Sequence, residues 1–175
     1  MPLTPEFLDI VKSGNETAID KAFFEGHYPE VFHVDWKEDD ADIVSYCAES
    51  LRLDDLSAVW NEDQDVLTVI YRGKENVVPL QLHGGDRYIT ICTLNKLLEP
   101  DYEIRYMVCS HGSDTGGFVA LSNSEWQQLE AANAVVAAEN FINPGWLPDI
   151  FMDLTDDHLP PAALARHKRM VNRHR

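Results

Sequence analysis

The sequence has few of the features that mark a binding or catalytic site. Its three cysteines are an odd number at wide spacing and form no Cys-x-x-Cys pair: Cys47, Cys92 and Cys109. Each lies in an apolar run, so we expect inert, buried thiols. No window approaches the ~20 apolar residues of a membrane span. The amino terminus lacks the basic and apolar regions of a signal peptide, which predicts a soluble, cytoplasmic protein.

Basic residues are scarce outside the C-terminal end. Five of the fourteen fall in the last eleven residues, which contain no acidic residue. The first 164 residues carry nine basic against thirty acidic side chains, a formal charge of −21. Such a body is repelled by phosphate backbones, which excludes direct nucleic-acid binding by it. The basic tail is expected to lie against the acidic body or at a neighbouring subunit, so a homo-oligomer held by this tail is one alternative.

The composition is typical of a globular protein. The chain has 175 residues, of which 45% are hydrophobic and 10% aromatic. At this length folding buries roughly 70% of the surface that the unfolded chain exposes, which is enough for one hydrophobic core without disulfide or metal cross-links. We therefore expect a single domain over residues 1–175.

The order of periodic segments predicts an α+β fold. Residues 1–52 read as mainly helical, with Thr4, Asn15 and Asp39 or Asp40 as N-caps and an ambiguous strand or loop at Val31–Trp36. Residues 56–121 are sheet-rich with one inserted helix, and residues 122–175 are helical with a basic tail. The sheet is expected to be mostly antiparallel, built from a three-stranded meander and a later hairpin, and flanked by N-terminal and C-terminal helices.

The sheet-rich region allows more detailed predictions. Val66–Tyr71 is a continuous, largely β-branched run and should be the central, most buried strand of the meander. Gly73–Asn76 is predicted as a turn, with the third strand near Val78, Leu80 and Leu82. Asp86 is predicted to cap the inserted helix, which ends at Leu98. The hairpin pairs residues 102–109 with residues 118–121.

The C-terminal region begins with a clear helix signal. Ser122 and Glu125 match a capping box. The helix that they open is predicted to extend through an alanine-rich stretch toward Phe141. A last, basic helix is expected from Pro161 to about residue 172.

The loop Ser110–Gly117 is the first candidate for a ligand or catalytic site. It contains a base, three hydroxyls, a carboxylate and three glycines. His111 is the candidate base, with Ser113 and Asp114 assisting. Cys109 and His111 have the residue types of a nucleophile and its base, but their spacing along a strand end does not make their polar atoms meet. The same loop composition is typical of an ordinary exposed hairpin connection.

Other patterns give weaker signals. The segment His83-Gly84-Gly85-Asp86 lacks the spaced glycines of a phosphate loop. The histidines form no metal-binding pair at i, i+4, and Asn61–Asp65 lacks the glycine and distal glutamate of a calcium loop. Asp153, Asp156 and Asp157 contribute to a cation site only if folding brings them together. The sequence therefore predicts no cofactor and no metal site.

The charge distribution favours a non-enzymatic protein that binds a basic protein partner. Complementary charge sets specificity and speeds encounter. An immunity or antitoxin-type inhibitor of a cationic toxin, such as a nuclease, fits this pattern. The alternatives are an enzyme or small-ligand protein that uses the 110–117 loop, and a structural oligomer. The predicted partner-binding residues are Glu38, Asp39, Asp40, Asp42, Glu62, Asp63 and Asp65.

Overall fold

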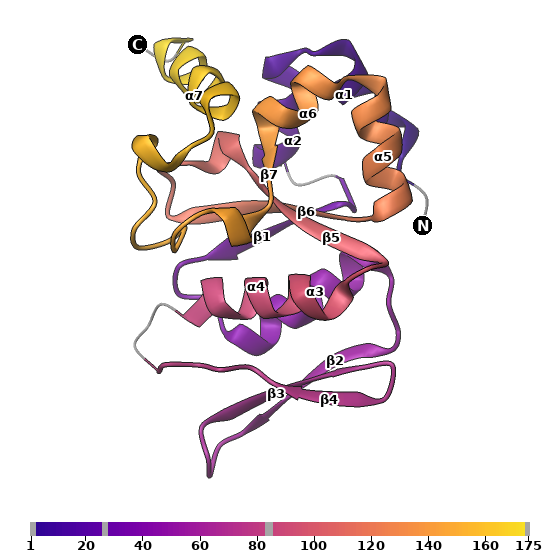
Figure 1. Cartoon of the computed structure of the whole chain (residues 1–175), viewed down its shortest axis with the longest axis vertical. Coiled ribbons are helices and arrows are strands. Elements are labelled where there is room, and N and C mark those ends of the chain that lie inside the picture. Colours follow the sequence, from indigo (N-terminus) through magenta and orange to yellow (C-terminus); the bar gives the residue numbers. More distant parts are fainter. Residues whose placement is uncertain (1–2, 26–27, 83–85, 174–175) are drawn as a thin grey trace.

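The computed structural model describes residues 3–25, 28–82 and 86–173, and it shows the predicted α+β fold (Figure 1). Two antiparallel sheets enclose a pair of helices, and further helices cover the outer face of the larger sheet. None of the helices in these described ranges is long and apolar enough to cross a membrane. The α-helices are α1 (Pro5–Ser13), α2 (Glu16–Glu25), α3 (Asp40–Leu51), α4 (Asp86–Leu98), α5 (Asn123–Ala132), α6 (Ala134–Asn140) and α7 (Pro161–Arg173).

The larger sheet has the strand order β1-β6-β5-β7. Its strands are β1 (Val31–Asp35), β6 (Thr115–Ser122), β5 (Tyr102–Met107) and β7 (Phe141–Ile142). The predicted hairpin is confirmed as β5 and β6, where Ile104 lies opposite Ala120. The ambiguous segment after residue 30 is a strand, β1, which pairs with β6 and forms one edge of this sheet.

The smaller sheet is the predicted meander, with the order β2-β3-β4. Its strands are β2 (Leu56–Asn61), β3 (Val66–Tyr71) and β4 (Lys74–Val77). The central strand is the most buried, as predicted. The predicted position of the third strand is wrong. Arg72 and Gly73 adopt φ values of 52° and 70°, which make a tight two-residue hairpin turn, so β4 starts directly after Gly73 and ends before Pro79.

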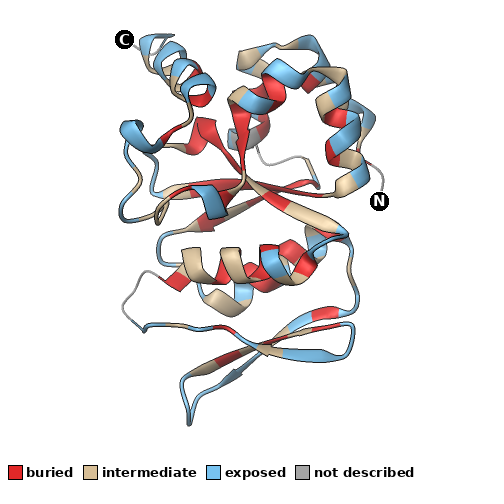
Figure 2. Cartoon of the chain, viewed as in Figure 1, coloured by how far each residue is buried: buried red, intermediate tan, exposed pale blue. Residues whose placement is uncertain are grey.

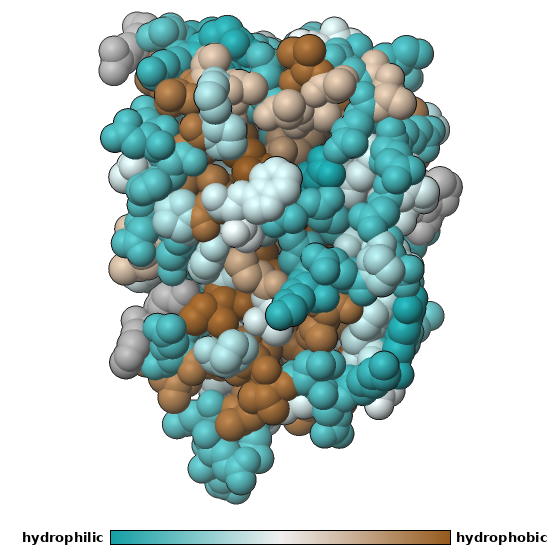
Figure 3. Space-filling view, in the orientation of Figure 1, coloured by the Kyte–Doolittle hydropathy of each residue, from teal (hydrophilic) through white to brown (hydrophobic). Residues whose placement is uncertain are grey.

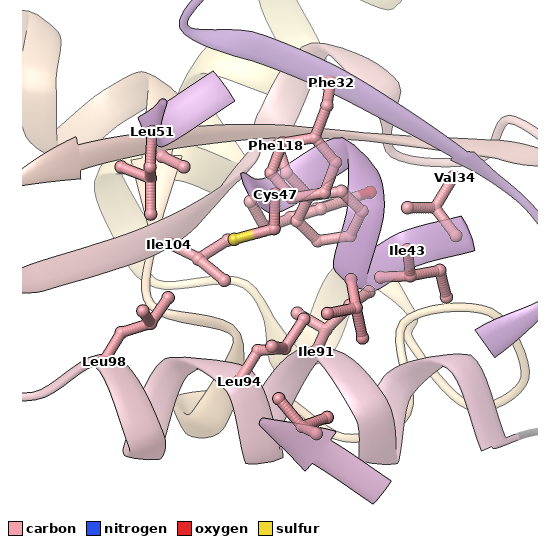
Figure 4. Packing of buried hydrophobic residues seen from close by; sticks show 14 of the residues in the cluster. Phe32, Val34, Ile43, Cys47, Leu51, Ile91, Leu94, Leu98, Ile104 and Phe118 are labelled. Carbon is pink, nitrogen blue, oxygen red and sulfur yellow. The ribbon is translucent and has the colours of Figure 1, made fainter. Parts of the chain in front are cut away.

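The larger sheet separates two hydrophobic clusters. Alternate residues on a strand point to opposite faces; accordingly, Phe118 joins the cluster under α3 and α4, whereas Val119 joins the cluster under α1, α2, α5 and α6. Figure 4 shows the first cluster, in which Cys47 and Ile104 lie between the strands and the two enclosed helices. The buried residues follow this layering, and the outer surfaces of the smaller sheet are mostly exposed (Figure 2).

A side chain completes the free edge of β5. Only Tyr106 and Met107 of β5 pair with β7. Beside them, the Asn95 amide of α4 donates to the Ile104 carbonyl (3.1 Å) and accepts from the Ile104 N–H (2.8 Å). Asn95 thereby takes the place of a neighbouring strand and satisfies two backbone groups that are otherwise buried without partners.

We expect Asn95→Leu to lower the free energy of unfolding by about 2 kcal/mol or more, because each unsatisfied buried group costs ~1–3 kcal/mol. Urea denaturation measures this change. The matched control is Asn76→Leu on β4, whose amide donates only to the Lys74 carbonyl at 3.3 Å. An equal effect of the two substitutions would contradict the role given to Asn95.

At the helix ends, the structure confirms one local prediction and corrects or refines two others. The Ser122–Glu125 capping box is present as predicted, but the helix does not continue to Phe141. Asn133 leaves helical geometry (φ −161°, ψ 88°) and its side chain accepts from the Val136 N–H, which starts a separate helix, α6. Asp39 occupies the N-cap position of α3, but its side chain accepts no capping hydrogen bond.

Asp86 has a different role from the predicted helix cap. Its carboxylate accepts from the N–H groups of Gln81 (2.8 Å) and Leu82 (2.7 Å), so it fastens the segment that leaves the smaller sheet. Both carboxylate oxygens accept from this preceding segment. The prediction that Asp86 caps the helix depended on its position in the sequence alone and is wrong. His83, Gly84 and Gly85 lie outside the described residues.

Candidate functional site

The basic tail forms helix α7 and lies against acidic residues of its own chain. Arg166 is 1% exposed and binds Asp20 of α2 and, through Nε (3.0 Å), the Asn140 amide oxygen of α6. Arg169 pairs with Glu16 at 2.7 Å, and Arg173 also binds Glu16. Of the two positions expected for the tail, the structure shows the first. An oligomer held by this tail stays a prediction.

This network neutralises carboxylates at one end of the molecule only. Burial raises the pKa of Glu16, but hydrogen bonds from Arg173 and Arg169 outweigh that effect and hold it below its ordinary value. The arginine partners are Glu16, Asp20 and Glu139, which belong to α2 and α6. None of the seven predicted partner-binding acids is among them.

Four of these seven acids surround the start of α3. Glu38 accepts from the Tyr46 hydroxyl at 3.2 Å. Asp40 accepts from the Thr90 hydroxyl at 2.5 Å, and its partial burial raises its pKa despite that bond. Asp39 and Asp42 are exposed. Anionic side chains are favoured at a helix N-terminus, so the fold itself stabilises this concentration of charge.

The other three acids occupy the β2–β3 turn. Glu62, Asp63 and Asp65 are all exposed, and within the described ranges they take part in no ion pair. Figure 3 shows that the projecting lower end of the molecule, where this turn lies, is hydrophilic. The two acidic sets therefore lie on different layers, one at the enclosed helix α3 and one at the tip of the smaller sheet.

A groove runs beside the α3 set. It has a volume of about 630 Å³ and lies between the edge strand β1 and α3. Two carboxylates and two phenols line it, from Glu38, Glu49, Tyr46 and Tyr28. Burial, followed by the charge of Glu38, raises the pKa of Tyr46, so this phenol stays protonated and donates to that carboxylate. The groove thus offers acceptors to cationic groups beside an edge strand.

The 110–117 loop is shorter than predicted, because β6 already starts at Thr115. The Ser110 hydroxyl donates to the Met107 carbonyl (2.7 Å) and accepts from the Gly117 N–H (3.0 Å). The Ser113 hydroxyl accepts from the Thr115 N–H at 3.2 Å. The two serine hydroxyls are therefore hydrogen-bonded to backbone groups and stabilise the turn.

His111 meets two polar side chains that lie far along the chain. Its Nε2 lies 3.0 Å from Oδ1 of Asp156, and Nε2 of His167 lies 3.6 Å from the same oxygen. The two imidazole rings are 4.6 Å apart and nearly perpendicular, at 71°. Asp114 is not one of the three grouped residues, and the Ser113 hydroxyl is hydrogen-bonded to the Thr115 N–H. Asp114 instead uses its carbonyl to accept from the Trp36 N–H.

The cysteine beside this loop is unsuited to nucleophilic chemistry. Cys109 is 5% exposed, and burial raises its pKa to about 12. Cys47 is likewise buried, with its pKa raised to about 12, while Cys92 is partly buried. A thiol with such a pKa carries almost no thiolate at neutral pH.

Comparison with protein families, curated proteins and solved structures finds no match for this chain.

Sequence reasoning found His111 and weighed Asp156, but it missed His167. The three residues come from the turn after β5, from a 3-10 helix and from α7. Their separation along the chain gives no spacing signal, and only the fold brings them together.

Proposed function

We propose that this chain binds a basic protein partner through the groove between β1 and α3, with the acidic β2–β3 turn contributing long-range attraction. The observation that carries the proposal is the pair of carboxylates, Glu38 and Glu49, in a groove beside an edge strand. Lysine and arginine side chains are the natural occupants of such a groove, because they donate to carboxylates and their cations are attracted to tyrosine rings.

The arrangement of the basic tail supports this proposal. Its arginines are held by Glu16, Asp20 and Glu139, away from the groove. Five of the predicted partner-binding acids are exposed and have no ion pair within the residues that the structure describes: Asp39, Asp42, Glu62, Asp63 and Asp65. These carboxylates are free to attract a cationic surface.

The partner class that we propose is a cationic enzyme that acts on nucleic acid, such as a nuclease toxin. Its phosphate-binding surface carries the lysines and arginines that a carboxylate-lined groove accepts. Occupation of that surface would inhibit the enzyme, which is the action of an immunity or antitoxin-type protein.

The test is quantitative capture of partners from native cells by chemical cross-linking, followed by affinity measurement. We expect a basic protein to be captured and its affinity to fall by about thirtyfold or more in Glu38→Gln/Glu49→Gln, since the loss of charge-paired contacts costs ~2 kcal/mol or more. If the captured partner is a nuclease, the double variant should also inhibit it less than the unchanged chain does.

The matched control is Glu6→Gln/Asp9→Asn, which removes the same charge from two exposed positions on α1. This control should retain nearly full affinity. Capture of only neutral or acidic proteins, or equal losses in the two double variants, would overturn the proposal.

A further inference from the structure

We propose that His111, Asp156 and His167 bind a divalent transition-metal ion of the zinc type. Each residue offers one ligand atom, and all three atoms lie within 4.8 Å of one another. Two imidazole nitrogens and one carboxylate oxygen form a ligand set that suits Zn²⁺, with a fourth position for water. This site is independent of the proposed partner groove.

The distances fit one ion in the centre of the cluster. Ligand atoms bound tetrahedrally to zinc, each about 2.0–2.1 Å from the metal, lie about 3.3 Å from each other. The carboxylate oxygen of Asp156 lies 3.0 Å from Nε2 of His111 and 3.6 Å from Nε2 of His167. These two distances are close to that spacing, and the two imidazole nitrogens lie within 4.8 Å of each other, so coordination would require the side chains to close around the ion.

A hydrogen bond between His111 and Asp156 explains why these two residues lie together, but it does not explain His167. His111 and Asp156 are within hydrogen-bond distance, whereas Nδ1 of His167 is buried and has no hydrogen-bond partner among the described residues. A buried imidazole without hydrogen bonds is costly. A metal ion at Nε2 would give this ring a bond that it otherwise lacks, while Nδ1 would keep its proton and stay without a partner among the described residues.

The imidazole and carboxylate sides of the cluster differ in their exposure to solvent. The two histidine side chains are 8% and 11% exposed, while Asp156 is 53% exposed. The site is therefore enclosed by protein on the imidazole side and open to solvent on the carboxylate side.

A bound ion would join three segments that are distant in sequence. His111 follows the 3-10 helix Val108–Ser110, Asp156 begins the 3-10 helix Asp156–His158, and His167 lies on α7. Metal binding should thus fasten α7 and the preceding segment to the end of β5. It should stabilise the folded chain, because the ion binds the native arrangement alone.

The test is a titration of the metal-free full chain with Zn²⁺ and, separately, with Co²⁺, followed by calorimetry and by visible absorption. We expect one ion per chain, a Co²⁺ spectrum with nitrogen and oxygen ligation, and a rise in Tm with Zn²⁺. Asp156→Asn changes an exposed residue and should fold normally. It should weaken Zn²⁺ binding by about tenfold or more, as should His167→Ala, because each removes one of the three protein ligands.

One neighbouring residue provides a matched control. Asp157→Asn changes the adjacent exposed carboxylate of the same 3-10 helix. This control should bind Zn²⁺ as the unchanged chain does. Failure of the unchanged chain to bind either ion, or an equal loss in Asp157→Asn and Asp156→Asn, would overturn the metal site.

Discussion

Replacing Arg166 with methionine is expected to lower the free energy of unfolding by about 3 kcal/mol, because removal of one member of a buried ion pair is strongly destabilising and leaves Asp20 with only the more exposed Arg173 as an ion-pair partner among the described residues. Arg166 is 1% exposed, and its partner Asp20 has a side chain that is 11% exposed. The same change removes the donor to the buried Asn140 amide oxygen. Chemical denaturation followed by circular dichroism measures the loss.

The adjacent network provides an internal control. Arg169 also pairs with two carboxylates, Glu16 and Glu139, but its side chain is 44% exposed. Exposed ion pairs contribute ~1 kcal/mol or less, so Arg169→Met should have a small effect. If both variants lost the same stability, burial would not be the reason why Arg166 matters.

The double variant Arg166→Met/Asp20→Leu distinguishes a lost attraction from an uncompensated charge. Because it removes both buried partners, it should recover part of the stability that Arg166→Met loses. No recovery would indicate that Arg166 contributes mainly through packing and through its bond to Asn140.

The sequence predicts those features of the fold that depend on local signals. The capping box at Ser122, the central strand Val66–Tyr71 and the N-terminal start of α7 at Pro161 all follow from residue type and period. These signals depend on residues that are close together in the sequence, so a single sequence is enough to identify them.

Features that depend on contacts between distant segments could not be predicted in the same way. β1 is defined by its pairing with β6, which lies more than eighty residues later in the chain. Asp86 is bound by a preceding loop, and Asn133 interrupts an otherwise continuous helical pattern. The cluster of His111, Asp156 and His167 requires three elements to meet.

The acidic residues of the two predicted sets should control how fast the partner is encountered. Neutralising five exposed acids should lower the association rate constant by about tenfold or more at low salt, since complementary fields accelerate encounter by 10–10³-fold. Dissociation should change little, because these acids lie outside the groove lining. The variant converts Asp39, Asp42, Glu62, Asp63 and Asp65 to the corresponding amides.

A second variant controls for net charge. It changes five exposed acids located elsewhere, with the same loss of formal charge: Glu6, Asp9, Glu99, Asp153 and Asp157. If position matters, this variant should associate faster than the first. Equal rates would show that net charge alone governs encounter.

The most direct measurement of the proposed function is the association rate of the unchanged chain with its captured basic partner over a series of ionic strengths. Salt screens charges beyond ~10 Å at 0.1 M, so attraction between opposite charges should weaken steeply as salt is added. The account predicts a large fall in the association rate constant with little change in the dissociation rate. An association rate that does not depend on salt would contradict it.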